Sequence, residues 1–261
     1  MLKLSNAEDW KFYGKGNANI VYKYQGSDLT FHNKLLRLRQ SNQIYNTRQI
    51  YIHYNNIPNQ LSQHAIQLEL VQVSFLKEGC LETDQFGLLM PDLTQGHELV
   101  KKERYYSVFQ SHETNSWIFE LKPKWLKQNE KGCRNCTMHV RKYKHVPSFC
   151  SLDLLRTDSV LKCCQSLFND PTFYLPLAYY LKTEKSILKT IESLQTDVDF
   201  DYDPVDAICL QMMLRDLTIF INIRNSRVQN VTITDMDPKW EGKLQEWRMK
   251  EKKLNSSMYT H

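Results

Sequence analysis

The feature that constrains the fold most is an alternating strand that ends in carboxylates. Val231 and Ile233 alternate with threonines, which predicts a strand with one buried face. Asp235 and Asp237 follow at its end, and Pro238 stands where a helix can begin, behind a carboxylate able to cap it. The sequence therefore predicts a strand, a pair of acids and a helix in immediate succession.

The helix expected from Pro238 would have a basic face. Lys239, Lys243 and Trp247 are spaced i, i+4 and i+8, so they would share one side of it. Carboxylates hold Mg²⁺ and lysines hold phosphates, which is the arrangement that phosphoryl transfer needs. A capped surface helix with solvated lysines is the other interpretation, because clusters of charge are commonly solvated.

A second strand, at residues 217–223, is expected to pair with this one. A two-residue turn at Asn225 and Ser226 would carry the register back to place Asp216 opposite Asp235, with Cβ atoms about 5 Å apart. Two carboxylates so close repel each other unless a metal or a proton lies between them. This register predicts a metal site, and a one-residue bulge would remove it.

Composition indicates a soluble, intracellular protein. The 261 residues are 41% hydrophobic and 24% charged, which suits one large domain or two lobes. A net charge of +5 favours polyanionic partners without identifying them. Seven cysteines, with no apolar run long enough for a signal peptide or a membrane span, predict a reducing compartment.

A glycine-containing loop lies between two aromatic strands near the N-terminus. The loop residues are Gly14, Lys15, Gly16, Asn17, Ala18 and Asn19. A Gly-x-Gly loop between strands lets the backbone approach nucleotide phosphates, as in kinases. A plain hairpin is the alternative, because Asn19 stands where a third glycine is usual.

The next strand carries arginines, and a later one ends at a boundary. Arg37 and Arg39 are two residues apart, so they would share a face, either under nucleotide phosphates or on a solvated edge. An apolar strand stopped by Pro91 and Asp92 predicts the end of a lobe. We therefore expect an N-lobe at residues 1–92 and a C-lobe at residues 93–261.

Charged and apolar residues alternate just before the middle of the chain. Glu120, Lys122 and Lys124 would place three charges on one face of a strand. Pro123 argues against the strand continuing beyond Lys122. One acid among basic groups at a strand end is unusual for a pattern that serves solubility alone.

Several metal-binding residue types follow this strand. Cys133, Cys136 and His139 have Cys-x₂-Cys-x₂-His spacing, with His145 and Cys150 downstream. Zinc sites usually place the second ligand pair 12 or more residues from the first, and these candidates are crowded. We therefore predict that Cys133 and Cys136 are not required for folding through zinc.

Several of these stretches together resemble the inositol-pentakisphosphate 2-kinase family. The matching segments, in family order, are 14–19, 35–37, 120–124, 138–139, 149–154, 215–216 and 235–239. Glu-x-Lys-Pro-Lys is the most specific of them, and the length suggests a compact fungal-type member. The chain departs from the family at Tyr143, where plant and animal members have a basic residue, and it lacks a recognisable plant-type zinc motif.

The resemblance implies an α+β, two-lobed inositol phosphate kinase fold distantly related to protein kinases. It implies that ATP, with Mg²⁺, phosphorylates the 2-hydroxyl of inositol 1,3,4,5,6-pentakisphosphate to give inositol hexakisphosphate (phytate). The enzyme would be nuclear and monomeric, with no membrane or nucleic-acid partner. Two alternatives stay open. One is a kinase of another inositol polyphosphate, and the other is a zinc-knuckle nucleic-acid-binding protein using the basic run at 141–144.

The resemblance also assigns roles by position. Asp216 and Lys122 would be catalytic, and Asp235 and Asp216 would hold the metal. The nucleotide would be bound by Gly14, Lys15, Gly16, Asn17, Ala18, Asn19, Val21, Arg37 and Asp92. The inositol phosphate would be bound by Lys122, Lys124, Arg141, Lys142, Lys239, Lys243 and Trp247.

Overall fold

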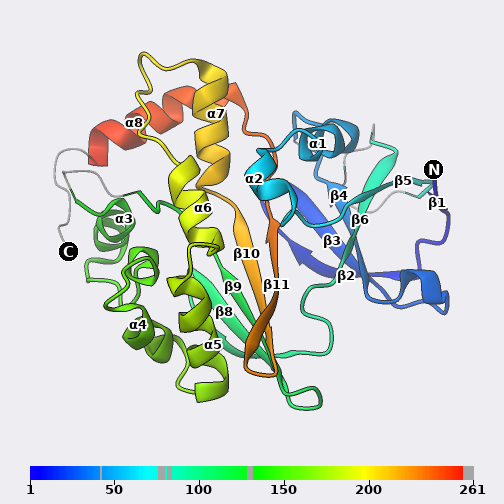
Figure 1. The fold of residues 1–261 in the computed structure, drawn as a ribbon. Coiled ribbons are helices and arrows are strands. Elements are labelled where there is room, and N and C mark those ends of the chain that lie inside the picture. The colour runs from blue at the N-terminus through cyan, green and yellow to red at the C-terminus, as the bar shows by residue number, and fades with distance from the viewer. Residues whose placement is uncertain (42, 76–79, 81–83, 128–131, 255–261) are drawn as a thin grey trace. The chain divides into compact units, whose positions relative to one another are not determined.

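The computed structural model describes residues 1–41, 43–75, 80, 84–127 and 132–254 (Figure 1). The protein has a mixed α+β fold with two sheets. Internal contacts divide the chain into an N-terminal unit, residues 1–95, and a C-terminal unit, residues 96–261. Among the described residues no helix is both long and apolar enough to span a membrane.

The N-terminal unit is built on a six-stranded sheet with the order β1-β5-β6-β4-β3-β2. Its strands are β1 (Lys3–Leu4), β2 (Trp10–Lys15), β3 (Asn19–Tyr24), β4 (Lys34–Arg39), β5 (Glu69–Val73) and β6 (Phe86–Pro91). Its helices are the 3₁₀ turn η1 (Leu29–Phe31), α1 (Thr47–Tyr54) and α2 (Asn59–Ser62). The strands predicted on either side of the glycine loop and at the two arginines are confirmed.

The N-terminal sheet packs around a core of aromatic and aliphatic side chains. Trp10 and Tyr24 pack edge to face across the β2–β3 pair, and Leu36 of β4 and Val71 of β5 are fully buried beside them. β4 is buried on both faces, and Arg37 and Arg39 are buried together with its leucines. The rigid sheet fixes the positions of the loops at its ends.

The C-terminal unit contains a five-stranded antiparallel sheet with the order β11-β10-β9-β8-β7. Its strands are β7 (Glu98–Lys102), β8 (Tyr106–Ser111), β9 (Ser116–Leu121), β10 (Thr218–Arg224) and β11 (Arg227–Thr234). Its helices are α3 (Arg134–Tyr143), η2 (Ser151–Leu154), α4 (Val160–Leu167), α5 (Pro171–Lys182), α6 (Ile187–Leu194), α7 (Val205–Leu214), η3 (Glu241–Lys243) and α8 (Leu244–Leu254). Helices α3 to α6 gather beside the sheet, and α5 packs against β10 and β11 (Figure 1).

Two neighbouring strands bring the charged segments of the C-terminal unit to one end of its sheet. β9 stops at Leu121, two residues before Pro123, as predicted. Because β9 and β10 are antiparallel and Leu121 pairs with Ile219, the chain leaving β9 lies beside the chain entering β10. Trp117 and Phe119 anchor β9 by packing on Phe173 of α5.

The hairpin of β10 and β11 turns where the sequence predicted, but its register differs. Asn225 and Ser226 both have left-handed backbones, with φ of 53° and 56°, as a two-residue hairpin turn requires. A bulge then inserts Gln229, so that Ile223 pairs with Val228 and Asn222 pairs with Asn230.

The predicted pairing of Asp216 with Asp235 is therefore wrong. Thr218 pairs with Thr234 as the last pair of the hairpin, and Asp216 precedes β10. The physical reason is burial. Ile219 must share a buried face with Ile233, its partner, and a two-residue turn without a bulge would set inward residues opposite outward ones.

The single helix predicted from Pro238 is also wrong. After Thr234, Asp235 adopts a left-handed backbone with φ of 62°, which turns the chain out of the strand. The next regular elements are η3 and then α8, so Lys239 precedes both helices. Trp247 lies in α8 and is buried with Phe200 and Ile208.

Candidate active site

The centre of the candidate site is an aspartate held between two lysines. Asp216 accepts a hydrogen bond from Lys124 Nζ at 2.6 Å through Oδ1 and one from Lys239 Nζ at 2.5 Å through Oδ2. The Asp216 side chain is 50% exposed, and the two lysine side chains are 29% and 20% exposed. Three segments thus meet at this end of the sheet: the chain after β9, the chain before β10 and the chain after β11.

The two lysines set the protonation state of this aspartate. Burial favours the neutral acid, but the charges of Lys239 and Lys124 and their hydrogen bonds outweigh it and hold the pKa of Asp216 below its usual range. The carboxylate is therefore ionised at neutral pH and able to accept a proton or orient a hydroxyl. The lysines are the point charges that phosphate groups need.

Asp235 is the candidate metal ligand that fits best. It lies on the exposed side of the turn after β11, and its Oδ2 accepts a hydrogen bond from the Thr218 hydroxyl at 2.5 Å. Among the described residues its Oδ1 has no hydrogen-bond partner, so it can bind a hard cation such as Mg²⁺. Asp216 fits a metal less well because both of its oxygens contact lysines.

Lys122 and Lys124, which follow β9, have different backbone environments. The Lys122 backbone N–H donates to Tyr105 O at 2.7 Å and so continues the β8–β9 edge, with its side chain partly exposed. Lys124 has a left-handed backbone with φ of 59°, which is uncommon for a residue with a side chain. This turn, rather than the alternation of a strand, directs Lys124 to Asp216.

The glycine loop of the N-terminal unit is supported by polar side chains from the chain after β4. Gln40 Nε2 donates to Gly16 O at 2.5 Å, and Gln43 Nε2 donates to Asn17 O at 3.2 Å. Arg39 Nη1 donates to the Asn19 side chain at 2.8 Å. Residues of the N-terminal unit itself therefore hold the loop in one conformation.

The outer side of this loop is open. A Cβ atom built at Gly14 meets nothing within 4 Å, so a ligand can approach the backbone there. Lys15 is exposed, and Arg37 is buried on β4 opposite Val21. The open backbone at Gly14 and the exposed Lys15 suit nucleotide phosphates. Because Arg37 is buried in the sheet, only a group that enters between the strands and the loop could contact it.

The Asp92 carboxylate accepts its hydrogen bonds from residues of the N-terminal unit. It accepts from Lys23 Nζ at 2.9 Å and from both Thr94 N and Thr94 Oγ1, at 3.1 and 2.9 Å. The Asp92 side chain is only 2% exposed. It therefore fixes the end of β6, and any contact with a nucleotide would come from the adjacent backbone.

Four other predicted substrate-binding residues lie in different parts of the C-terminal unit. Arg141 donates to the carbonyls of Lys253 and Leu254 at the end of α8. Lys142 is exposed and lies over the Tyr143 ring. Lys243 is exposed in η3, and Trp247 is buried as described above.

Three of the cysteine and histidine candidates come together. The sulfur atoms of Cys133, Cys136 and Cys150 all lie within 4.8 Å of one another, and all three residues are buried. Three thiolates are three of the four ligands of a closed zinc site, so this cluster can hold a soft metal ion. Cys150, noted downstream in the sequence, joins Cys133 and Cys136 in this group, and the burial of the cluster differs from the exposed knuckle of a nucleic-acid-binding protein.

Sequence reasoning missed an aromatic platform beside the site. The Trp125 ring lies 3.7 Å from the Arg134 guanidinium and 4.0 Å from that of Arg215, measured to the ring centroid. Arg134 also pairs with Glu251 of α8. The only sequence signal was position, since Trp125 follows Lys124 and Arg215 precedes Asp216.

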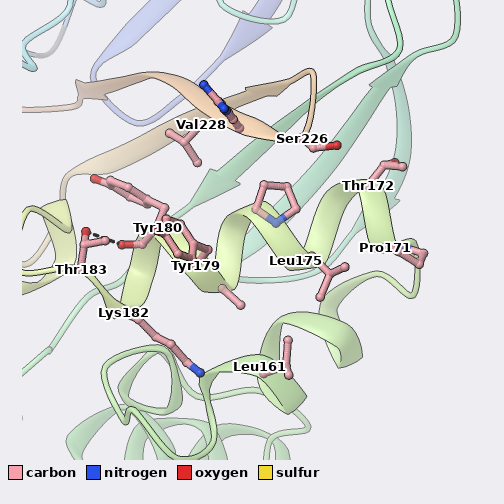
Figure 2. A pocket seen from close by; sticks show the side chains of 13 residues that line it. Leu161, Pro171, Thr172, Leu175, Tyr179, Tyr180, Lys182, Thr183, Ser226 and Val228 are labelled. Carbon is pink, nitrogen blue, oxygen red and sulfur yellow. Dashed lines mark hydrogen bonds between the residues drawn. The ribbon is translucent and has the colours of Figure 1, made fainter.

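A separate pocket of about 930 Å³ lies along α5, between α4 and the hairpin turn (Figure 2). Its lining includes Leu161, Leu175, Tyr179 and Val228, with Lys182 at its edge. The predicted site residues, all of them described, take no part in this lining. Its apolar walls do not suit a polyphosphate.

The lysine-paired aspartate of the C-terminal unit and the open glycine loop of the N-terminal unit are features that phosphate-transferring proteins use to bind phosphate groups. The chain belongs to the inositol-pentakisphosphate 2-kinase family, whose model matches residues 12–175. The family resemblance seen in the motifs is thereby confirmed.

Fungal proteins of the same description are similar over most of the chain. The inositol-pentakisphosphate 2-kinase of Eremothecium gossypii is 25% identical over 94% of this chain and 96% of its own length. That of Kluyveromyces lactis is 25% identical over 94% of both chains. That of Debaryomyces hansenii is 24% identical over 84% of this chain and 77% of its own.

Proposed function

We propose that this protein transfers the γ-phosphate of ATP to the 2-hydroxyl of inositol 1,3,4,5,6-pentakisphosphate, giving inositol hexakisphosphate and ADP. Family membership and the names of the fungal relatives support the substrate. Asp216, Asp235 and Lys239 lie beyond the segment that the family model matches, so the roles proposed for them rest on the resemblance of their motifs and on their geometry. We also propose, on the family resemblance alone, a nuclear monomer without nucleic-acid or membrane partners.

The observation that carries this proposal is the carboxylate of Asp216 between two lysines. In the proposed step the 2-hydroxyl oxygen bonds to the γ-phosphorus while the bond from that phosphorus to the β,γ-bridging oxygen breaks. The hydroxyl proton passes to Asp216, and the bridging oxygen leaves with ADP. Lys124 and Lys239 would stabilise the charge on the transferred phosphoryl group and on the acceptor phosphates.

The remaining residues would bind the two substrates. The backbone of residues 14–19 would contact the ATP phosphates, with Val21, Arg37 and the segment at Asp92 lining the nucleotide site. Mg²⁺, when bound, would neutralise phosphate charge, and Asp235 is the residue proposed to hold it. Lys122 would contact the transferred group, and Lys243, Arg141 and Lys142 would supply further positive charge to a substrate with five phosphates.

A product assay tests the proposal. The full-length protein is incubated with ATP and Mg²⁺ and, separately, with each available inositol phosphate isomer, and the products are resolved by chromatography. We expect the 1,3,4,5,6-pentakisphosphate to be used best and to yield the hexakisphosphate, with Asp216→Asn as the inactive control. Faster phosphorylation of another isomer would replace the proposed substrate, and absence of phosphorylation of every isomer would overturn the proposal.

A further inference from the structure

The backbone at Lys124 is in a conformation that needs support from its surroundings. A left-handed φ of 59° is unfavourable for a residue with a Cβ atom, and it persists only where neighbouring groups hold it. The Lys124 side chain reaches Asp216 from this conformation, three residues beyond the end of β9 at Leu121. The groups that stabilise this backbone conformation therefore help to place Lys124 beside Asp216.

A buried glutamine holds it. Gln195 is 0% exposed and lies at the C-terminal end of α6. Its Nε2 donates to the carbonyl oxygen of Lys124 at 2.9 Å, and its Oε1 accepts from the N–H of Leu126 at 2.9 Å. One side-chain amide thus brackets the backbone on both sides of Trp125.

The same amide reaches the segment that carries Asp216. The second Nε2 hydrogen bond of Gln195 goes to the carbonyl oxygen of Leu214 at 3.1 Å, two residues before Asp216. Gln195 therefore links the backbone of Lys124 to that of Leu214, two residues before Asp216, whose side chain forms the 2.6 Å ion pair with Lys124. Both donors and the acceptor of the amide are used, so its orientation is fully determined.

Gln195 is itself fixed by a second glutamine. Gln211 of α7 donates to the carbonyl oxygen of Leu194 at 3.0 Å and accepts from the N–H of Thr196 at 2.9 Å. The residues before and after Gln195 are thus tied to α7, the helix that leads directly into Arg215 and Asp216. The amide is a rigid spacer, because each end of it is bonded to ordered backbone.

We propose that Gln195 is a positioning residue that fixes Lys124 relative to Asp216 and thereby sets the position and orientation of the carboxylate. This inference rests on the proposed function for its effect on turnover, but its geometric content does not. The alternative is that Gln195 only satisfies buried backbone groups and contributes stability, as buried amides commonly do. The positioning role predicts that loss of the amide changes the contact between Lys124 and Asp216, whereas the purely stabilising role predicts that this contact is unchanged.

The test replaces Gln195 with methionine, which keeps its length but removes all three hydrogen bonds. Gln195→Asn is the milder second variant, since a shorter amide cannot reach both backbones. Thr47→Val is the matched control, because Thr47 is 1% exposed and bonds Asp84 in the N-terminal unit through its hydroxyl and its N–H. Lys124→Ala marks the full loss of the ion pair.

The first readout is the titration of the Asp216 carboxyl carbon by NMR, with the signal assigned by its absence in Asp216→Asn. Lys124 and Lys239 are the charged groups that contact Asp216 among the described residues. We expect the Gln195 variants to titrate at higher pH than wild type, toward Lys124→Ala, while Thr47→Val matches wild type. Turnover should fall about 10- to 100-fold in Gln195→Met, as a small misplacement of a reacting group costs.

Each outcome decides something. An Asp216 titration unchanged in both Gln195 variants would overturn the positioning role, whatever happens to stability or activity. A shifted titration with unchanged turnover would uphold the positioning role and refute the catalytic role proposed for Asp216. If adding Gln195→Met to Lys124→Ala lowers turnover by the same factor as it does in wild type, Gln195 does not act through Lys124 and the inference fails.

Discussion

Replacing Asp216 with asparagine should separate substrate binding from phosphoryl transfer. In wild type the carboxylate contacts the ammonium groups of Lys124 and Lys239, which are also the groups proposed to bind substrate phosphates. The acid and the substrate therefore share the same two cations. Asparagine keeps the shape of the side chain and removes the negative charge and the ability to accept the hydroxyl proton.

The magnitudes follow from the geometry. Two unit charges 4 Å apart interact by about 1 kcal/mol in bulk water and about 4 kcal/mol at an effective dielectric of 20. Because Asp216 is half exposed, the lower value applies, and loss of its repulsion should tighten binding of the inositol phosphate by about 1 kcal/mol, or roughly fivefold. Loss of a general base should slow transfer about 10²- to 10⁴-fold.

Calorimetric titration with inositol pentakisphosphate and with ATP, together with rapid-quench measurement of transfer, would test both numbers. Glu184→Gln is the control, since Glu184 is an exposed acid paired with Lys189 and its loss changes the net charge equally. ATP affinity should stay near the wild-type value in Asp216→Asn. Weaker binding of the inositol phosphate, with transfer at the wild-type rate, would refute the reasoning.

The other predictions concern the neighbours of Asp216. Lys124→Ala should raise the KM for the inositol phosphate more than that for ATP, and an effect confined to ATP would place Lys124 under the nucleotide. It should also move the acid limb of kcat/KM to higher pH, because a carboxyl whose pKa is lowered by lysines stays ionised further into acid than one without them. Lys239→Ala should raise the same KM more than Lys243→Ala, and only the exposed Lys243 should lose its effect in high salt. Asp235→Asn should weaken ATP binding in the presence of Mg²⁺ and leave it unchanged without the metal, as calorimetry with and without Mg²⁺ would reveal.

Local periodicity predicted the strands because half-buried strands impose a period of two on the sequence. The pattern of apolar residues in the two strands also implies the bulge between them. Ile219 must pair with Ile233 and Ile221 with Val231, which gives even sums of residue numbers, whereas a two-residue turn at 225–226 gives odd sums. An inserted residue was therefore required, and reading the turn without the burial pattern produced the wrong register.

Other parts of the site depend on contacts between residues far apart in the chain. Gln195 lies 71 positions from Lys124, and a buried glutamine at a helix end has no local pattern that reveals its partners. Cys150 joins Cys133 because η2 packs on α3. The left-handed backbone at Lys124 likewise has no signature, since glycine and asparagine are the residues that announce this conformation.

The stacking on Trp125 has an evolutionary consequence. Burial and the nearby charge of Arg134 lower the pKa of Arg215 to about 10, while the charges of Asp197 and Glu251 raise it. The charges of the two arginines at this ring are thus partly offset by those of two acids from other segments. Among relatives, replacement of one of these arginines by a neutral residue should be accompanied by loss of one of the acids, so that the four positions covary while the indole is retained.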